Sequence, residues 1–151
     1  MLAVSNRCST IRWVVELSPV RAAPLWISEA VSAVAAGWPS PADDYLEGPI
    51  DLSERLMPRP AATFLVRAAG WSMKGAGISD GDMLIVERGR TAVDGQIVIA
   101  VVDGEFLVKT LRSAGRRPRL VAAHPDFPDI PLLGREVQIW GVVCWVLHKT
   151  I

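Results

Sequence analysis

A series of short apolar segments, each bounded by turn-forming residues, occupies the chain from residue 61 to its carboxyl end. The segments are rich in valine, isoleucine, leucine and aromatic residues, which is typical of β-strands buried on one or both faces. The predicted strands are residues 63–68, 83–87, 96–102, 105–111, 119–123 and 137–147. Aspartate–glycine pairs at positions 80–81, 94–95 and 103–104 offer the positive-φ residues that tight turns need, and the last pair predicts a hairpin. The pattern predicts a mainly β domain of short strands and tight turns.

Length and composition exclude several classes of protein. The 151 residues suffice for one domain with a sizeable core but are few for two ordinary domains. Hydrophobic residues make up 50% of the chain, yet no apolar run approaches the roughly 20 residues that span a bilayer, so we expect no membrane protein. The formal net charge of zero disfavours nonspecific binding to nucleic acid. The two cysteines, Cys8 and Cys144, show no disulfide or ligand spacing, which fits a cytoplasmic location.

The first 45 residues differ in composition from the rest, and we interpret them as a flexible amino-terminal arm and connector. Residues 38–44 hold two prolines and two adjacent acids, a composition that favours an extended or turn-like chain. Before them, Ser28 could cap a short helix over residues 29–36. The sequence therefore predicts an arm at residues 1–45 and a β domain at residues 46–151.

Within the β domain, Ser72 and Lys109 could carry chemistry as a pair. Ser72 lies in the glycine-rich residues 70–78 after a predicted strand, where its hydroxyl can project and nearby N–H groups can hold an oxyanion. The strand period places Lys109 between Leu107 and Leu111, and burial there would lower the pKa of its amine and make it a general base. Each residue alone has a commoner interpretation, namely a turn serine and an edge-strand lysine whose amine reaches water.

Other groups of residues that could carry catalysis or binding have weaker support in the sequence. A Ser-His-Asp triad would need His124 or His148, and neither has an obvious orienting partner in the sequence. The adjacent acids Asp43 and Asp44 are interpreted as solvating the connector rather than as an acid/base pair. An arginine cluster at residues 112–119 is interpreted as a solvated hairpin tip rather than a nucleic-acid contact. No phosphate loop, dinucleotide-binding glycine pattern or metal-binding helix motif occurs, so we expect no cofactor and no metal.

Four blocks of the sequence resemble the UmuD-like members of the LexA-like self-cleaving serine peptidase family. The blocks are residues 36–45 (AGWPSPADDY), 70–73 (GWSM), 78–86 (ISDGDMLIV) and 102–109 (VDGEFLVK). They occur in the order and at the spacing of the family and cover most of residues 36–111. The resemblance implies a LexA/signal-peptidase-like β domain that carries a cleavable amino-terminal arm.

The resemblance also implies roles for individual residues. Ser72 corresponds to the nucleophile, Lys109 to the general base, and the backbone N–H groups of Trp71 and Ser72 to the oxyanion donors. The bond between Ala36 and Gly37 corresponds to the one that the protein cuts in itself. Trp71 is a departure, because UmuD proteins usually have an acidic residue before the serine.

By the same resemblance we expect a homodimer that cleaves itself when stimulated by the RecA filament on single-stranded DNA, in the SOS response. The product would serve as accessory subunit to a UmuC-like error-prone translesion DNA polymerase. Trp140 and Trp145 in the last predicted strand suit a core, or else a dimer or partner surface.

Residue chemistry at the bond agrees with self-cleavage. Ala36 is small enough for a tight pocket, Gly37 permits close approach of the chain, and the prolines after it disfavour a helix that would hide the bond. Three alternatives remain open: a truncated LexA or phage repressor, a membrane-linked signal peptidase, and a catalytically silent polymerase-binding module. Only 36 residues precede the bond, too few for a winged helix-turn-helix, so we expect no sequence-specific DNA binding.

Overall fold

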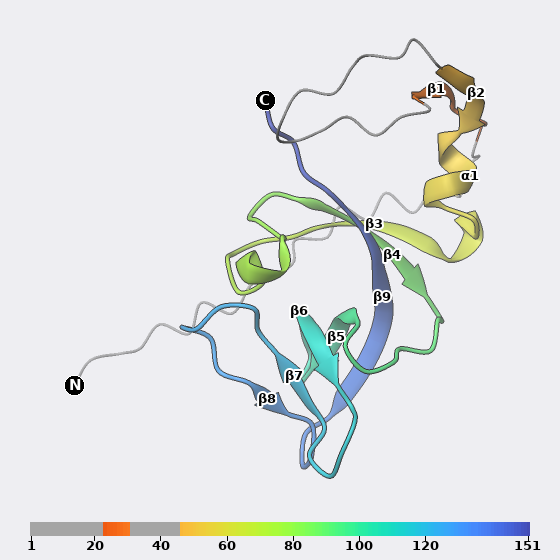
Figure 1. The fold of residues 1–151 in the computed structure, drawn as a ribbon. Coiled ribbons are helices and arrows are strands. Elements are labelled where there is room, and N and C mark those ends of the chain that lie inside the picture. The colour runs from red at the N-terminus through yellow and green to blue at the C-terminus, as the bar shows by residue number, and fades with distance from the viewer. Residues whose placement is uncertain (1–22, 31–45) are drawn as a thin grey trace.

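A computed structural model of the chain describes residues 23–30 and 46–151, which form two antiparallel sheets (Figure 1). The larger sheet has seven strands in the order β3-β4-β9-β5-β6-β7-β8. Its strands are β3 (Thr63–Arg67), β4 (Met83–Arg88), β5 (Ile97–Val102), β6 (Glu105–Arg112), β7 (Arg119–Val121), β8 (Ile130–Pro131) and β9 (Val137–Leu147). No helix in these two ranges is long and apolar enough to cross a membrane. The predicted mainly β fold is confirmed.

The long strand β9 joins the two halves of this sheet. Its carboxyl half pairs with β4, where Met83 lies opposite Leu147, and its amino half pairs with β5, where Val102 lies opposite Val137. Figure 1 shows β9 as a long curved strand that runs through the centre of the domain. The first and last strands of the sheet therefore belong to one continuous hydrogen-bonded structure.

Side chains on both faces of the central strands are buried, as the apolar sequence of these strands predicts. In β5, Val98, Ile99 and Ala100 are all fully buried, although successive side chains point to opposite faces. Two core clusters result. One holds Val66, Ala68, Met73, Ile78, Leu84, Val86, Ile99 and Val108, and the other holds Val98, Ala100, Val102, Leu107, Leu111, Leu120 and Val142. A polar side chain on these strands is consequently removed from water.

The two tryptophans of β9 have different surroundings. Trp140 is half-buried against the first core cluster, with edge-on ring contacts to Phe64 and Phe106. Trp145 is 43% exposed, opposite Ile85 of β4. The core interpretation is therefore confirmed for Trp140 and is wrong for Trp145, because the face of β9 that carries Trp145 is only partly covered.

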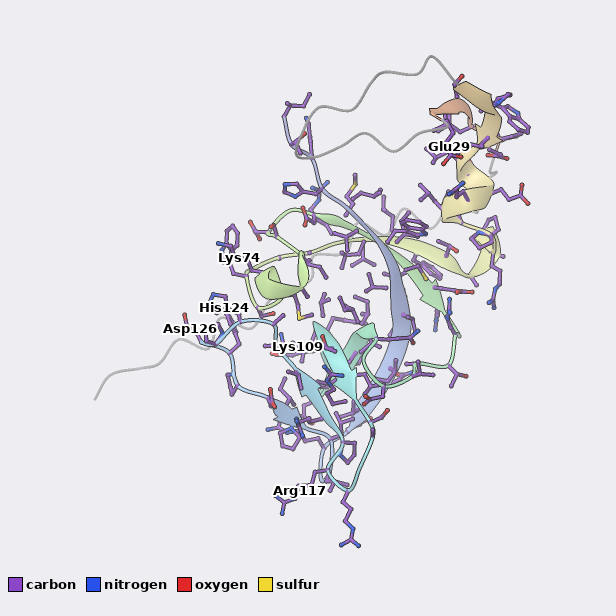
Figure 2. The ribbon with its side chains drawn as sticks, in the orientation of Figure 1. Glu29, Lys74, Lys109, Arg117, His124 and Asp126 are labelled. Atoms are coloured by element: carbon purple, nitrogen blue, oxygen red, sulfur yellow. The ribbon has the colours of Figure 1, made fainter. Side chains whose placement is uncertain are left out.

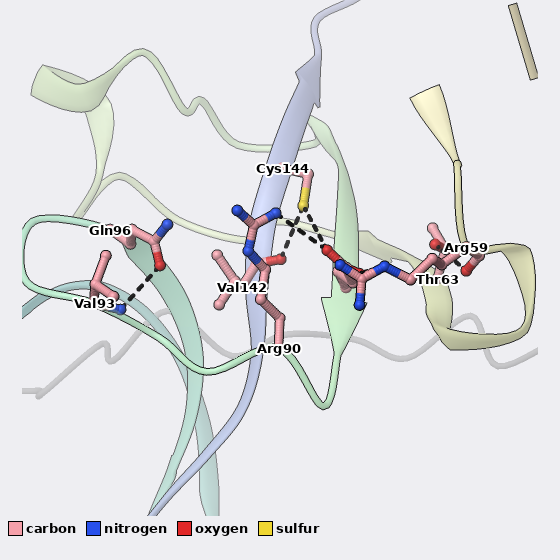
Figure 3. Close-up of polar contacts among 8 residues, drawn as sticks. Arg59, Thr63, Arg90, Val93, Gln96, Val142 and Cys144 are labelled. Atoms are coloured by element: carbon pink, nitrogen blue, oxygen red, sulfur yellow. Dashed lines mark hydrogen bonds and ion pairs between the residues drawn. The ribbon is translucent and has the colours of Figure 1, made fainter. Parts of the chain in front are cut away.

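A buried carboxylate connects the segment before β3 to strand β4. Glu87 of β4 is 6% exposed and lies 2.8 Å from Arg59 Nε and 3.2 Å from Arg90 Nη1. Cys144 of β9 is 4.0 Å from the same carboxylate (Figure 3). Among the described residues Oε1 accepts no hydrogen bond, so Arg59 neutralises it as an ion pair. Such charge pairs offset part of the cost of burying the carboxylate.

Six predicted strands match β3, β4, β5, β6, β7 and β9 within two residues at each end. The predicted hairpin is confirmed, since Val102 pairs with Glu105 and the turn residues Asp103 and Gly104 have φ of 50° and 84°. The short strand β8, the 3₁₀ turns η1 (Pro60–Ala62) and η2 (Lys74–Ala76), and the helix α1 (Leu52–Leu56) were not predicted.

The smaller sheet pairs β1 (Trp26–Ala30) with β2 (Leu46–Asp51). The predicted helix over residues 29–36 is wrong at its start, because Glu29 and Ala30 belong to β1 and pairing with β2 overrides the local helix signal. The rest of that helix, the Ala36–Gly37 bond and the acids Asp43 and Asp44 lie outside the described residues. The division of the chain at residue 45 stays a prediction.

Gly141 of β9 provides a test of the packing between β9 and β4. A Cβ atom there would lie 2.7 Å from Val86 Cγ1 and 3.0 Å from the Glu87 carbonyl oxygen. Because Val86 is fully buried, Gly141→Ala should lower the free energy of unfolding by about 1–3 kcal/mol, the usual cost of overpacking. Urea unfolding at 25 °C measures this. Gly48→Ala is the control, since no atom lies within 4 Å of its added Cβ, and equal stability of the two variants would contradict the packing argument.

Candidate active site

Ser72 and Lys109 lie 37 residues apart in the sequence and meet in the interior of the domain. Lys109 Nζ donates a hydrogen bond of 2.7 Å to Ser72 Oγ. Ser72 is 1% exposed and Lys109 is 2% exposed, so water has little access to either group. Figure 2 shows where Lys109 lies in the domain. The structure thus brings together the two side chains that the sequence singled out.

The position of β6 in the sheet explains the burial of Lys109. This strand pairs with β5 on one side, where Lys109 lies opposite Val98, and with β7 on the other. The neighbours on the same face, Leu107 and Leu111, are 3% and 5% exposed. The interpretation of Lys109 as an edge-strand lysine that reaches water is therefore wrong, because β6 is an interior strand.

A tight turn after β3 positions Ser72. Gly70 begins the turn at φ 89°, which an L side chain rarely adopts, and its N–H donates to Asp80 Oδ1 at 2.7 Å. The Lys74 N–H then donates to the Trp71 carbonyl at 3.1 Å, at the start of the 3₁₀ turn η2. The buried Met73 side chain anchors the turn in the core. Local hydrogen bonds and one core contact therefore fix the backbone on both sides of Ser72.

The loop between β7 and β8 is bonded directly to this turn. The Ala123 N–H donates to the Ser72 carbonyl at 2.8 Å, and the Gly75 N–H donates to the Ala123 carbonyl at 2.8 Å. A Cβ at Gly75 would lie 2.6 Å from that carbonyl oxygen, so the close approach requires glycine. From the same loop, the Phe127 ring centroid lies 5.9 Å from Lys109 Nζ. This loop was not recognised as part of the site, because nothing in its sequence indicates contact with Ser72.

Trp71, the residue before the serine, is directed to solvent. Its side chain is 51% exposed, and the Lys74 ammonium lies 5.7 Å from the centroid of its ring. The indole is thus separate from the buried serine–lysine contact, and a bulky side chain is tolerated there. The role of the Trp71 and Ser72 N–H groups as oxyanion donors stays a prediction.

The two histidines have partners that the sequence did not reveal. His148 Nδ1 lies 2.6 Å from Asp82 Oδ1, so the expectation that His148 lacks an orienting partner is wrong. The two residues are 66 positions apart and meet because the end of β9 pairs with the start of β4. His124 Nδ1 accepts the Asp126 N–H at 3.3 Å, and its ring packs edge-on against Phe127. His124 therefore stabilises the β7–β8 loop (Figure 2).

Asp82 is 3% exposed and is the best-buried carboxylate near the serine turn. Burial by itself would raise the pKa of Asp82, but the hydrogen bond from the Ser79 N–H and the contact with the His148 ring outweigh it and hold the pKa below its ordinary value. The carboxylate is thus charged in the folded protein at neutral pH. It connects the loop that follows η2 to the residues after β9.

The arginine cluster lies at the hairpin between β6 and β7, where Arg112 pairs with Arg119 across the two strands. Arg112 is 3.6 Å from Asp94 and Arg119 is 3.0 Å from Asp129, and Arg117 extends from the tip of the hairpin (Figure 2). These residues are exposed, in agreement with a solvated tip. In the ranges that the structure describes, no group of three or more histidine, cysteine or acidic side chains could hold a metal ion.

The buried contact between Ser72 and Lys109 is one that a serine peptidase could use, and the comparisons with known proteins show a peptidase family. The family model described as Peptidase S24-like matches residues 27–144, so the chain belongs to the S24-like peptidase family. SamA of Salmonella typhimurium is 44% identical over 138 residues, which cover 89% of this chain and 92% of SamA. ImpA of Escherichia coli is 47% identical over 117 residues, or 76% of this chain and 79% of ImpA.

A LexA repressor of Erwinia tasmaniensis is 40% identical over 121 residues, which cover 79% of this chain but 59% of the repressor. The similarity to SamA and ImpA therefore extends over more of the relative's length than the similarity to the repressor. Within the family the chain is a UmuD-like protein, as the sequence blocks indicated.

The depressed pKa of Asp82 predicts a pH-dependent contribution to stability. This contribution is fully present above the unfolded-state pKa of about 3.9 and is lost as the pH falls through the folded-state pKa. Between about pH 5 and 3, the free energy of unfolding should therefore fall more steeply for the unsubstituted protein than for Asp82→Asn. Urea unfolding at several pH values measures both slopes. Asp126→Asn, at an exposed loop position, is the control; parallel curves for Asp82→Asn and the unsubstituted protein would contradict the assignment.

Proposed function

We propose that this protein is a self-cleaving serine peptidase in which Ser72 and Lys109 cut the Ala36–Gly37 bond of the arm. The observation that supports it most directly is the buried contact of 2.7 Å between Lys109 Nζ and Ser72 Oγ. A serine hydroxyl is a weak nucleophile and needs an adjacent base within hydrogen-bond reach. Membership of the S24-like peptidase family supports the same activity. The arm would comprise residues 1–45 and the peptidase domain residues 46–151.

The proposed reaction begins with a neutral Lys109 amine. It accepts the Ser72 hydroxyl proton while Oγ attacks the Ala36 carbonyl carbon, and the N–H groups of Trp71 and Ser72 stabilise the oxyanion. When the C–N bond breaks, the Lys109 ammonium returns the proton to the Gly37 nitrogen, which leaves as an amine. Water, deprotonated by Lys109, then hydrolyses the Ala36 ester and regenerates Ser72. No metal or cofactor enters this sequence.

The biological setting that we propose follows from the likeness to UmuD-like proteins. A RecA filament on single-stranded DNA would stimulate cleavage in the SOS response, in the cytoplasm. The homodimeric product would act as accessory subunit of a UmuC-like error-prone DNA polymerase in translesion synthesis. The 44% identity to SamA, over 92% of the length of SamA, supports this role.

Substitution of the pair tests the chemistry. Ser72→Ala and Lys109→Ala should each abolish cleavage, because one variant lacks the nucleophile and the other lacks the base. The purified chain is incubated with RecA, single-stranded DNA and nucleotide, and the product masses are measured. Circular dichroism confirms that each variant is folded. His124→Ala and His148→Ala are the comparison variants and should still cut, because neither side chain takes part in the proposed proton transfer.

Loss of cleavage in His148→Ala with retention in Lys109→Ala would replace the proposed pair by a Ser-His-Asp arrangement that includes Asp82. The product masses also test the bond. The carboxyl-terminal fragment should begin at Gly37, and Gly37→Glu should block its formation because the bond must approach Ser72 closely. A fragment that begins at Ala36 would contradict the assigned bond.

The pH dependence of the rate tests Lys109 as the base. Only the neutral amine can accept the serine proton, so the first-order rate without RecA should rise as the pH increases and level off once the amine is deprotonated. The rate is measured from about pH 6 to 10, a window that reaches toward the ordinary lysine pKa of about 10.4. Lys109→Ala measured in parallel gives the background. A rate that peaks near pH 6 and falls toward alkaline pH would exclude a lysine base.

A further inference from the structure

The strand that precedes the proposed scissile bond in the sequence occupies one edge of β2. Strand β1 pairs antiparallel with β2, so that Trp26 lies opposite Asp51 and Ile27 lies opposite Ile50. The Leu52 N–H extends this pairing by donating to the Leu25 carbonyl at 2.8 Å. Figure 1 shows β1, β2 and α1 together, beyond the β3 end of the large sheet. The proposed scissile bond lies between the two paired strands in the sequence.

Residues of β2 and α1 present polar groups that recognise an extended chain. Asp51 Oδ1 accepts the Leu25 N–H at 3.1 Å while it also caps α1 through the Ser53 N–H at 2.9 Å. From α1, Arg55 Nη1 lies 3.3 Å from Glu29 Oε2 (Figure 2). The edge of β2 therefore offers three polar groups to a strand that lies along it: the Asp51 carboxylate, the Leu52 N–H and the Arg55 guanidinium.

The described side chains on and next to β1 are largely open to water. Leu25 is 54% exposed, Trp26 is 62% exposed and Ile27 is 38% exposed. The Arg55–Glu29 pair is exposed too, and exposed ion pairs contribute little. A sheet of two short strands is marginal in water by itself, but strands in one chain meet at an effective concentration in the millimolar range. The covalent connection is therefore an important part of what keeps β1 in place.

Only one edge of β2 is suited to accept a strand. Because the Leu52 N–H bonds to Leu25, the alternation of an antiparallel pair makes Ile50 a hydrogen-bonded partner of Ile27. The next position, Pro49, then directs its ring nitrogen away from β1. Proline has no N–H, so it interrupts the opposite edge of β2. Strand addition is thus directed to the edge that β1 occupies.

We propose that cutting the chain between β1 and β2 vacates this edge and makes it a docking site for an extended segment of a partner protein. The segment resembles β1: it runs antiparallel to β2, carries an apolar residue opposite Ile50, and carries a carboxylate two residues later for Arg55. Strand addition to an exposed edge is a common mode of peptide recognition. The inference rests on the proposed function only for the cut itself, which turns an intramolecular contact into an open surface.

An experiment with an external protease separates this inference from self-cleavage. The full chain with Ser72→Ala receives a recognition sequence for a site-specific protease within residues 31–45 and is cut completely. Gel filtration at micromolar concentration should separate the amino-terminal fragment from the remainder. A fluorescent peptide with the sequence of residues 23–30 is then titrated by anisotropy. It should bind the cut protein at least about tenfold more tightly than the uncut protein, whose own β1 competes at high effective concentration.

Charge reversal tests the predicted carboxylate. Arg55→Glu in the cut protein should weaken binding of the peptide, and a peptide with Glu29→Arg should restore it. Arg116→Glu, on the exposed hairpin between β6 and β7, is the matched control and should change neither titration. Co-elution of the amino-terminal fragment with the cut protein would overturn the proposal. Equal affinity of the cut and uncut proteins, or no binding to either up to millimolar peptide, would also overturn it.

Discussion

The buried contact between Lys109 Nζ and Ser72 Oγ is the constraint on which the arrangement of the domain depends. An amine that is 2% exposed has lost its water, and a polar group without water needs a partner inside the protein. Burial requires β6 to be an interior strand, paired with both β5 and β7. For Ser72 to be the hydrogen-bond partner of Lys109, the turn after β3 must lie next to β6. The Ala123 N–H bond to the Ser72 carbonyl holds the turn there. The strand order of the large sheet and the contacts of the β7–β8 loop together keep Lys109 Nζ in hydrogen-bond contact with Ser72 Oγ.

Local sequence predicted six of the seven strands of the large sheet and made Ser72 and Lys109 candidates, whereas their paired roles came from the resemblance to the family. Alternation along β6 placed Lys109 on a face with Leu107 and Leu111, and all three side chains are buried. The Asp103-Gly104 turn was predicted because its conformation needs positive φ, which both residues adopt. The glycine-rich turn made Ser72 a candidate, and the resemblance to the family supplied its role. In each case the signal extends over a few neighbouring residues, which is the range over which backbone preference and side-chain period act.

Contacts between distant segments were not predicted, because they depend on residues that lie far apart in the sequence. Lys109 lies on an interior strand because of the order of the seven strands in the sheet. The sequence of β6 alone does not determine that order. His148 and Asp82 meet across 66 residues, and Ala123 and Phe127 reach the site from a loop without catalytic signature. The start of the predicted helix over residues 29–36 failed because β2, which lies after the connector, offers Glu29 and Ala30 a strand partner. Pairing between segments decided each of these outcomes.

Under the proposed self-cleavage, the geometry of the site favours the arm as the point of regulation. Ser72 and Lys109 are already in hydrogen-bond contact, and backbone bonds already fix the turn and the β7–β8 loop. A partner that stimulates cleavage thus has no catalytic groups to assemble. In the proposed mechanism it acts by favouring the arrangement of the arm in which the bond reaches Ser72, and its effect is limited to its differential affinity for that arrangement. Because β1 and β2 flank the bond in the sequence and are paired, any such arrangement must be compatible with that pairing or break it. Because the side chains of β1 are largely exposed, a partner that binds or displaces this strand would change the rate of the proposed cleavage with a small binding energy.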